Sequence, residues 1–244
     1  MGGARQTARN MTATNETVAA GLRRAQDLAY RLLDRVEQLE IVRPGQTEKQ
    51  ISLDISRLAG EELGFESAWH ENMIRSGPNT LLTFADALSD RTVEADDIVY
   101  ADLGPIFQAH KADFARTWVL GDDADKHKIT ADARCDLERG MQRMRENPDM
   151  TGEDVYTMVG QMAAEAGWEY RAAIAGHIVG TVPDAEDAKF LDPDTRSEIV
   201  LMPGHTRRLS HPRPDGLRHH WVLEVHYVDT ERKIGAFFED IATV

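Results

Sequence analysis

Apolar side chains recur at helical spacing in four stretches of this chain of 244 residues. In residues 16–39 they fall three or four positions apart, which predicts a long amphipathic helix. The same spacing predicts further helices over residues 47–63, 125–146 and 152–166. The helices therefore form two pairs, one near the N-terminus and one beyond the middle of the chain.

Strand-like apolar runs follow each helix pair. Residues 99–121 read VYADLGPIFQAHKADFARTWVLG, two apolar runs separated by a turn-like polar segment, which predicts a β-hairpin. Short strands are expected at residues 73–74 and 81–84, on either side of a Ser-Gly-Pro-Asn turn. A second hairpin is predicted at the end of the chain, over residues 221–229 and 234–244.

The succession of helix groups and strand groups is typical of the α+β class. No linker separates the groups, so residues 15–244 are expected to form a single domain. Residues 1–14 are small and polar, and we expect a flexible N-terminus there. Residues 183–220 are rich in proline, charge and histidine, and a long irregular segment of this kind is either functional or mobile.

Composition narrows the class of partner. A net charge of −14 argues against binding to nucleic acid or to an anionic membrane surface. No apolar run approaches membrane-spanning length, and the N-terminus lacks the core of a signal peptide. Cys135 is the only cysteine, which excludes a disulfide framework. We therefore expect a cytoplasmic protein whose partner is neither nucleic acid nor a membrane.

Four carboxylates occupy strand-like apolar contexts. Asp102 and Asp113 lie in the two runs of the first hairpin, and Glu224 and Glu239 lie in the middle of the two closing strands. A carboxylate in an apolar strand is costly unless it is paired, and two brought together repel, so a cation is the natural partner. His177 lies in a glycine-containing apolar run, where the backbone can approach closely.

This donor set suits divalent Mn, Fe, Co or Zn, because oxygen ligands are combined with an imidazole. Four carboxylates exceed the usual need of one ion, so two ions that share carboxylates are expected. Taken singly, each residue is more often a solvent-facing strand acid or an ordinary histidine. The metal hypothesis therefore depends on the whole set and on its order in the chain.

The set and its order resemble the pita-bread metallopeptidases, the family of creatinase, methionine aminopeptidase, aminopeptidase P and prolidase. The segments VYADLG and ADFARTWVLG place the two aspartates 113 − 102 = 11 positions apart, as in that family. AGHIVG resembles the family's histidine segment, and WVLEVHYVD and GAFFEDIATV resemble its two glutamate strands. SGPNT resembles a turn of the prolidase and aminopeptidase P branch.

The resemblance implies a fold and a set of roles. The expected fold is a curved, mostly antiparallel sheet covered by two pairs of helices, a single catalytic domain without the N-terminal domain of creatinase-type enzymes. Asp102 would chelate one ion, Asp113 and Glu239 would bridge both ions, and His177 and Glu224 would hold the second. Water between the ions would be the nucleophile, with Glu224 as the proton shuttle.

The chain departs from the family at its substrate-binding positions. Members of the family usually carry a histidine near Phe84 and another seven positions after the ligand histidine, where this chain has Asp184. His226 shares a strand face with Glu224 and is a second candidate catalytic residue. We therefore assign Phe84, Asp184 and His211 to the substrate pocket, while His205, His219 and His220 are weaker candidates.

Three functions remain open. The first is a two-metal hydrolase that resembles Xaa-Pro aminopeptidase or dipeptidase and attacks a peptide or peptide-like amide. The second is an enzyme of the same fold that acts on a small non-peptide substrate, as a C–N hydrolase or a lyase. The third is a non-catalytic binding module, against which the retained carboxylates argue. A homodimer is a further expectation, because a partner chain is one way to cover the site.

Overall fold

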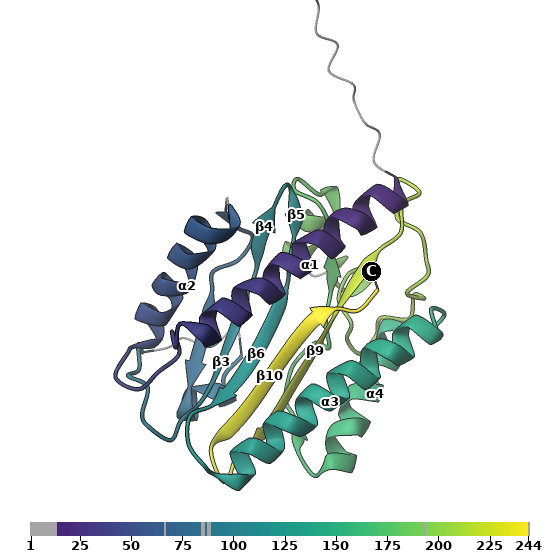
Figure 1. Ribbon diagram of the computed structural model, residues 1–244. Helices are drawn as coiled ribbons and strands as arrows, with labels where there is room; N and C mark the ends of the chain where they lie inside the picture. The colour runs from purple at the N-terminus through teal and green to yellow at the C-terminus, as the bar shows by residue number, and fades with distance from the viewer. Residues whose placement is uncertain (1–13, 66, 84–85, 87–88, 193, 244) are drawn as a thin grey trace, which may run out of the picture.

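Two pairs of helices cover a sheet in the computed structural model (Figure 1), which describes residues 14–65, 67–83, 86, 89–192 and 194–243. The first pair is α1 (Asn15–Gln38) and α2 (Glu48–Leu63), and the second is α3 (Ala124–Glu146) and α4 (Gly152–Ala166). All four predicted helices are confirmed, with ends within a residue or two of those expected. Within the described part of the chain, no helix is both long enough and apolar enough to cross a membrane.

Local sequence signals explain where these helices begin and end. Thr47 and Thr151 cap α2 and α4, each with the reciprocal side-chain and backbone hydrogen bonds of a capping box. Gly64 and Gly167 end the same helices in the left-handed conformation, with φ of 68° and 85°. The helix boundaries are therefore set by short-range interactions that the sequence displays directly.

The strands that follow the helix pairs form one large and one small sheet, and all pairings among them are antiparallel in the described residues. The large sheet runs in the order β2 (Met73–Ser76), β3 (Ile98–Leu103), β6 (Phe114–Val119), β10 (Ile234–Ile241), β9 (His220–Asp229) and β7 (Glu169–Tyr170), and β8 (Ile178–Val179) also pairs with β9. The small sheet contains β1 (Ser67–Ala68), β4 (Pro105–Phe107) and β5 (His110–Lys111). The α+β class and the closing hairpin are confirmed.

The first predicted hairpin is more elaborate than expected. The chain between β3 and β6 forms β4 and β5, which leave the large sheet and pair with each other, and β4 also pairs with β1. The turn between β4 and β5 places Gln108 and Ala109 at positive φ, 50° and 61°. The apolar alternation did not predict this excursion, because β4 and β5 are too short to show a period.

Two other expectations need correction or fall outside the described residues. The short strand predicted at residues 81–84 is wrong over its described part, because Gly77–Leu81 forms a 3₁₀ helix (η1) that follows β2 directly and Leu82 and Thr83 are irregular. Phe84 lies outside the described residues, as do residues 1–13 of the expected flexible N-terminus. The irregular segment contains two short 3₁₀ helices, η2 (Ala185–Leu191) and η3 (Arg196–Glu198).

The large sheet has an apolar helix-covered face and a mixed opposite face. Successive strand residues point to opposite faces. Val99 and Ala101 of β3 pack in one core cluster with α1 and α2, and Phe238 of β10 packs in another with α3 and α4. The alternate positions, which include Tyr100 and Phe237, face the other way. All four predicted carboxylates lie on this second, inner face.

Candidate metal centre

Three of the predicted carboxylates lie in one row across the large sheet. Asp102 of β3 pairs with Ala115 of β6, Ala115 pairs with Glu239 of β10, and Glu239 pairs with Glu224 of β9. Residues directly opposite each other in an antiparallel sheet point to the same face. The register of the strands therefore aims all three carboxylates at the inner face, with the small side chain of Ala115 between them.

Asp113 stands directly before β6, two residues before Ala115. Continuing the alternation of β6 by one residue places it on the same face. Its carboxylate is buried, with 2% of the residue exposed. The eleven-residue spacing predicted from the sequence thus brings both aspartates to one place, although the chain between them takes a longer route than a simple hairpin.

His177 reaches the cluster through a close backbone contact. The amide of Val222 in β9 donates to the carbonyl oxygen of His177 at 2.8 Å. Gly176 has φ of 136°, and a Cβ there would stand 2.0 Å from the carbonyl oxygen of Val222. Only glycine permits this approach, as the flanking sequence predicted.

The imidazole of His177 faces three carboxylates. Its Nε2 atom lies 3.1 Å from Oδ2 of Asp113, 3.7 Å from Oε1 of Glu239 and 3.8 Å from Oε1 of Glu224. The five residues proposed as ligands are all buried. The structure therefore brings the five together on the inner face of the sheet.

His70 also belongs to this cluster, and sequence reasoning missed it. Its Nε2 lies 3.5 Å from Oδ1 of Asp113 and 3.7 Å from Oδ1 of Asp102. Within this cluster, two groups have donor atoms spaced closely enough for one ion each: His70 with Asp102 and Asp113, and Asp113 with His177 and Glu239. His70 precedes β2 in a short irregular segment without periodicity, so only the tertiary structure reveals it.

The acids of the cluster have imidazoles as their basic neighbours. Among the residues that the structure describes, no lysine or arginine lies within ion-pair distance of the four carboxylates; their basic neighbours are His70 and His177. Oδ1 of Asp102 and Oδ2 of Asp113 are buried and lack hydrogen-bond partners in the described ranges. Orphaned carboxylate oxygens beside imidazole nitrogens are the donor set of a divalent cation site, so the residues present fit a metal.

Burial and nearby charges shift the pKa values of the residues in this cluster when no cation is bound. Burial, opposed by the nearby His177 and aided by the charges of Asp113 and Asp102, raises the pKa of Glu224 to about 8. Burial likewise raises the pKa of Asp102 to about 6. Burial opposes the charged form of His70, but Asp102 and Asp113 outweigh it and raise its pKa to about 9.

His226 lies on the inner face but has a different environment. It is two residues from Glu224 on β9 and is 3% exposed. Its Nε2 donates to the carbonyl oxygen of Thr80 at 2.8 Å. Its ring packs against Tyr100 and Phe237, with centroids 5.9 and 5.5 Å away. The shared strand face was predicted correctly, while a catalytic role for His226 stays a prediction.

Of the predicted pocket residues, Asp184 and His211 are described, and neither is a member of the ligand-spaced groups. Asp184 accepts two hydrogen bonds from Arg213, each of 2.8 Å, and these bonds hold its carboxylate away from solvent. His211 is exposed, and its carbonyl accepts from Nδ1 of His219 at 3.2 Å. Phe84 lies outside the described residues. The assignment of these three to a substrate pocket stays a prediction.

Aromatic side chains form a wall beside both histidines. The ring of Trp69 lies 4.5 Å from that of His70 and 5.4 Å from that of His177, and Phe190 of η2 lies 5.4 Å from His177. The ammonium group of Lys111 stands 5.3 Å from the Trp69 ring and pairs with Asp187. The irregular segment therefore contributes Phe190 and Asp187 to the surroundings of the cluster.

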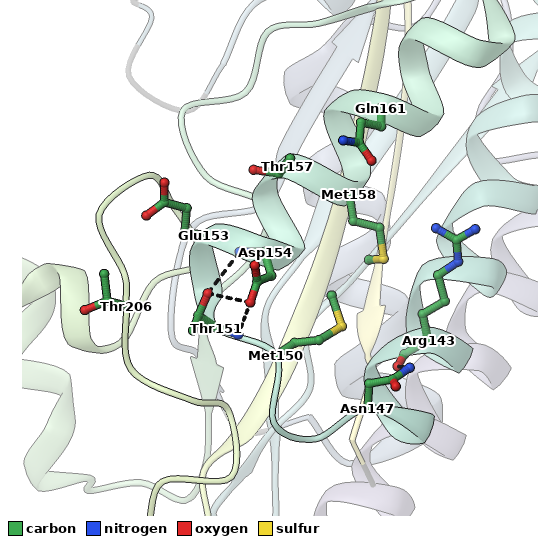
Figure 2. Close-up of a pocket in the computed structure, with 10 residues that line it drawn as sticks. All are labelled: Arg143, Asn147, Met150, Thr151, Glu153, Asp154, Thr157, Met158, Gln161 and Thr206. Atoms are coloured by element: carbon green, nitrogen blue, oxygen red, sulfur yellow. Dashed lines mark hydrogen bonds between the residues drawn. The ribbon is translucent and has the colours of Figure 1, made fainter.

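A hollow elsewhere on the molecule is distinct from this site. Figure 2 shows ten residues that line it, between the end of α3 and the first turns of α4. Thr151 and Asp154, which form the capping box of α4, are among them. None of the ten belongs to the carboxylate cluster, so the hollow adds no ligand to the candidate metal centre.

Comparison with known proteins agrees with this geometry. Over 143 residues the chain is 27% identical to the Xaa-Pro dipeptidase of Pyrococcus horikoshii, a match that covers 58% of this chain and 40% of that relative. The structure resembles the prolidase from Thermococcus sibiricus, with a TM-score of 0.74 and 19% identity, over 95% of this chain and 57% of that one. It also resembles the methionine aminopeptidase from Thermotoga maritima, with a TM-score of 0.67 and 16% identity, over 93% and 96% of the two chains.

These likenesses confirm the pita-bread fold. The chain spans less than half the length of its curated dipeptidase relative, so that protein's activity is not transferred with the match. Residues 20–244, which include all six members of the cluster, match the profile of one family. The chain belongs to metallopeptidase family M24.

Proposed function

We propose that this protein is a two-metal hydrolase that cleaves the amide bond of a small peptide. The observation that carries the proposal is the buried cluster of Asp102, Asp113, Glu224 and Glu239 without a compensating lysine or arginine among the described residues. Four carboxylates carry four negative charges when ionised, and two divalent cations would balance them. One ion would leave two buried charges uncompensated, which is costly.

The proposed ligand roles follow from position in the cluster. Asp102 would hold one ion, and His177 with Glu224 would hold the other. Asp113 and Glu239 lie between these ends and would serve both. Two such ions would supply the Lewis acidity for attack of water on an amide carbonyl. Mn²⁺, Co²⁺, Fe²⁺ and Zn²⁺ all suit carboxylates combined with imidazole.

Glu224 is proposed to move the proton that amide hydrolysis requires. It lies at the end of the carboxylate row, and its buried carboxyl group retains a proton more readily than an exposed glutamate. Such a group can take a proton from water and return it to the leaving amine. Trp69 and Phe190 would exclude bulk water beside His177, which faces Glu224.

Family membership and the dipeptidase relative support a peptide with a prolyl residue after the first position as the first substrate to test. One observation favours a second candidate, a small non-peptide substrate. Asp184 stands at the position where resemblance to the family predicts a histidine, and Arg213 binds its carboxylate on both oxygens. An imidazole donor to the scissile amide is therefore missing from that position.

Reconstitution of metal-stripped protein tests the proposal. We expect two ions per chain with Mn²⁺ or Co²⁺, and turnover of Xaa-Pro dipeptides that Asp113→Asn abolishes together with metal binding. Arg208→Ala provides a matched control, because its pair with Asp149 is exposed. Failure to bind any divalent ion would refute the metal centre. Full loading without turnover of any peptide would refute the peptidase and leave the non-peptide enzyme.

A further inference from the structure

His70 mirrors His177 across the carboxylate cluster. Each histidine places Nε2 within 4 Å of Asp113, His70 from the side of Asp102 and His177 from the side of Glu224 and Glu239. We propose that His70 is a metal ligand, so that each of the two ions has one imidazole. The inference rests on the metal pair of the proposed function and adds a residue that the family resemblance did not supply.

The two imidazoles are oriented by the same local device. Nδ1 of His70 lies 2.8 Å from the carbonyl oxygen of Glu71, and Nδ1 of His177 lies 2.8 Å from that of Ile178. A carbonyl oxygen can only accept, so Nδ1 carries the proton in the neutral ring and Nε2 presents its lone pair. In both residues Nε2 faces the carboxylates, where a bound cation would replace its proton and take up the lone pair. This is how a protein presents a metal-ligating histidine.

The segment that carries His70 is fixed against the strands that carry the aspartates. The backbone amide of Trp69 donates to the carbonyl of Gly104 at 2.9 Å, and its indole Nε1 donates to the carbonyl of Ala112 at 3.1 Å. Gly104 follows Asp102 by two residues, and Ala112 precedes Asp113 directly. The imidazole is therefore held in register with both of its carboxylate neighbours.

Gly104 leaves the space that the ring of His70 occupies. A Cβ at this position would stand 2.3 Å from Cδ2 of His70 and 2.6 Å from Nε1 of Trp69. Contacts this short do not occur in proteins, so a side chain at position 104 would displace the ring. The chain thus provides a ring-sized recess beside Asp102, and His70 fills it.

A second imidazole changes the expected metal preference. Without His70, the ion at Asp102 would have only carboxylate ligands and water, a set that suits Mn²⁺. An imidazole in that set favours Co²⁺, Fe²⁺ and Zn²⁺. The ligand role of His70 therefore predicts that the Asp102 side of the centre prefers these ions over Mn²⁺.

Metal binding by His70→Ala provides the test, with His127→Ala as the matched control. His127 is exposed on α3, and its Nε2 binds the carbonyl of Gly121, so the control removes an imidazole remote from the cluster. Calorimetric titration of stripped protein should show one of two Co²⁺ sites weakened about 10- to 100-fold or more in His70→Ala. Mn²⁺ affinity should fall less, and the visible spectrum of bound Co²⁺ should change at one site only.

X-ray absorption of the zinc-loaded wild-type protein tests the same proposal without a variant. Two imidazoles per two ions are expected, and one imidazole would overturn the assignment of His70. Unchanged Co²⁺ affinity and spectrum in His70→Ala would also overturn it, even if turnover fell, because that pattern belongs to a residue that contacts substrate. Wild-type protein that binds no ion would instead refute the metal centre as a whole.

Discussion

The acids and the histidines of the cluster are held by different kinds of structure. Asp102, Glu239 and Glu224 take their direction from the hydrogen-bonded register of continuous strands. His70 comes from an irregular segment whose Trp69 bonds to Gly104, and His177 comes from an isolated β-bridge directly before the two-residue strand β8, held by its backbone bond to Val222. The pairing register of a strand can shift only by whole residues, and a shift of one residue turns its side chains to the opposite face. A loop, in contrast, can move by fractions of an ångström. The acids therefore fix the place of the centre, and the histidines are the adjustable part.

Substitution of an acid held by the strands should have the largest effects. It should impair metal binding and hydrolysis, but it should stabilise the metal-free protein. Glu239→Gln keeps the register and the shape but removes a central carboxylate. We expect loss of bound metal and a fall in hydrolysis on the order of 10³-fold or more. The stripped variant should unfold at a higher temperature than stripped wild type, a gain of about 1–3 kcal/mol, because buried acids without a cation repel each other.

The control for this comparison is the loaded wild-type protein, which should be more stable than either stripped form. If stripped Glu239→Gln were less stable than stripped wild type, the row would be a structural feature of the sheet and not a site prepared for cations.

The loop-held half can be disturbed without touching a ligand. Gly104→Ala should push the ring of His70 away from Asp102, since the new Cβ would fall 2.3 Å from Cδ2 of the ring. Co²⁺ affinity at one site should fall about 10-fold or more, following the loss in His70→Ala. Calorimetric titration measures this effect. Equal affinity in Gly104→Ala and wild type would show that the recess at Gly104 does not position His70.

The contribution of the segment that follows His177 to the stability of the fold should depend on pH, because Asp184 titrates. Burial opposes ionisation of Asp184, but the two hydrogen bonds from Arg213 outweigh it and lower its pKa below the ordinary value. A depressed acid pKa stabilises the fold above the unfolded pKa of about 3.9, and that stability is lost as pH falls through the folded pKa. Asp184→Asn should therefore cost about 1–3 kcal/mol at neutral pH and progressively less below pH ~4.

Denaturant unfolding at several pH values measures this difference. Arg208→Ala is again the control, because its exposed pair with Asp149 should contribute nothing measurable at any pH. A cost of Asp184→Asn that did not change with pH would assign the effect to packing and not to the charged pair with Arg213.

The smallest effect is expected far from both halves. Gly60 lies inside α2, and a Cβ there would meet nothing within 4 Å. Gly60→Ala should stabilise the protein by about 0.5–1 kcal/mol and leave metal affinity unchanged. Thermal unfolding with a parallel Co²⁺ titration checks both points. A changed metal affinity in this variant would mean that general stability, and not local geometry, governs the response of Gly104→Ala.

The same contrast explains what the sequence could and could not predict. The four helices, the closing hairpin and the acids were predictable, because helical period, strand alternation and turn residues are short-range signals. Asp102 and Asp113 stood out because a charge interrupts an apolar run. His70 interrupts nothing, since its neighbours Trp69 and Glu71 have no periodic pattern, and its role depends on a contact with Gly104, 34 positions later (104 − 70 = 34).

The environment of His226 was likewise beyond the sequence. Strand alternation placed it correctly on the face of Glu224. Its hydrogen bond to Thr80 spans 146 positions and depends on η1, a 3₁₀ helix that appeared in the sequence as a turn and a short strand. Long-range partners of polar side chains are set by the packing of whole elements, for which a single sequence has no local signal.

The cross-strand row has a consequence for how the centre can vary. Neighbouring strands lie about 4.8 Å apart in any antiparallel sheet, because the peptide hydrogen bond fixes that distance. Asp102, Ala115, Glu239 and Glu224 occupy four successive strands, so the spacing of the strands sets the spacing of the acids. Substitution along the row changes which side chain stands at each position, while the spacing between the positions stays the same. The surrounding loops can therefore diverge without changing the spacing of the acids.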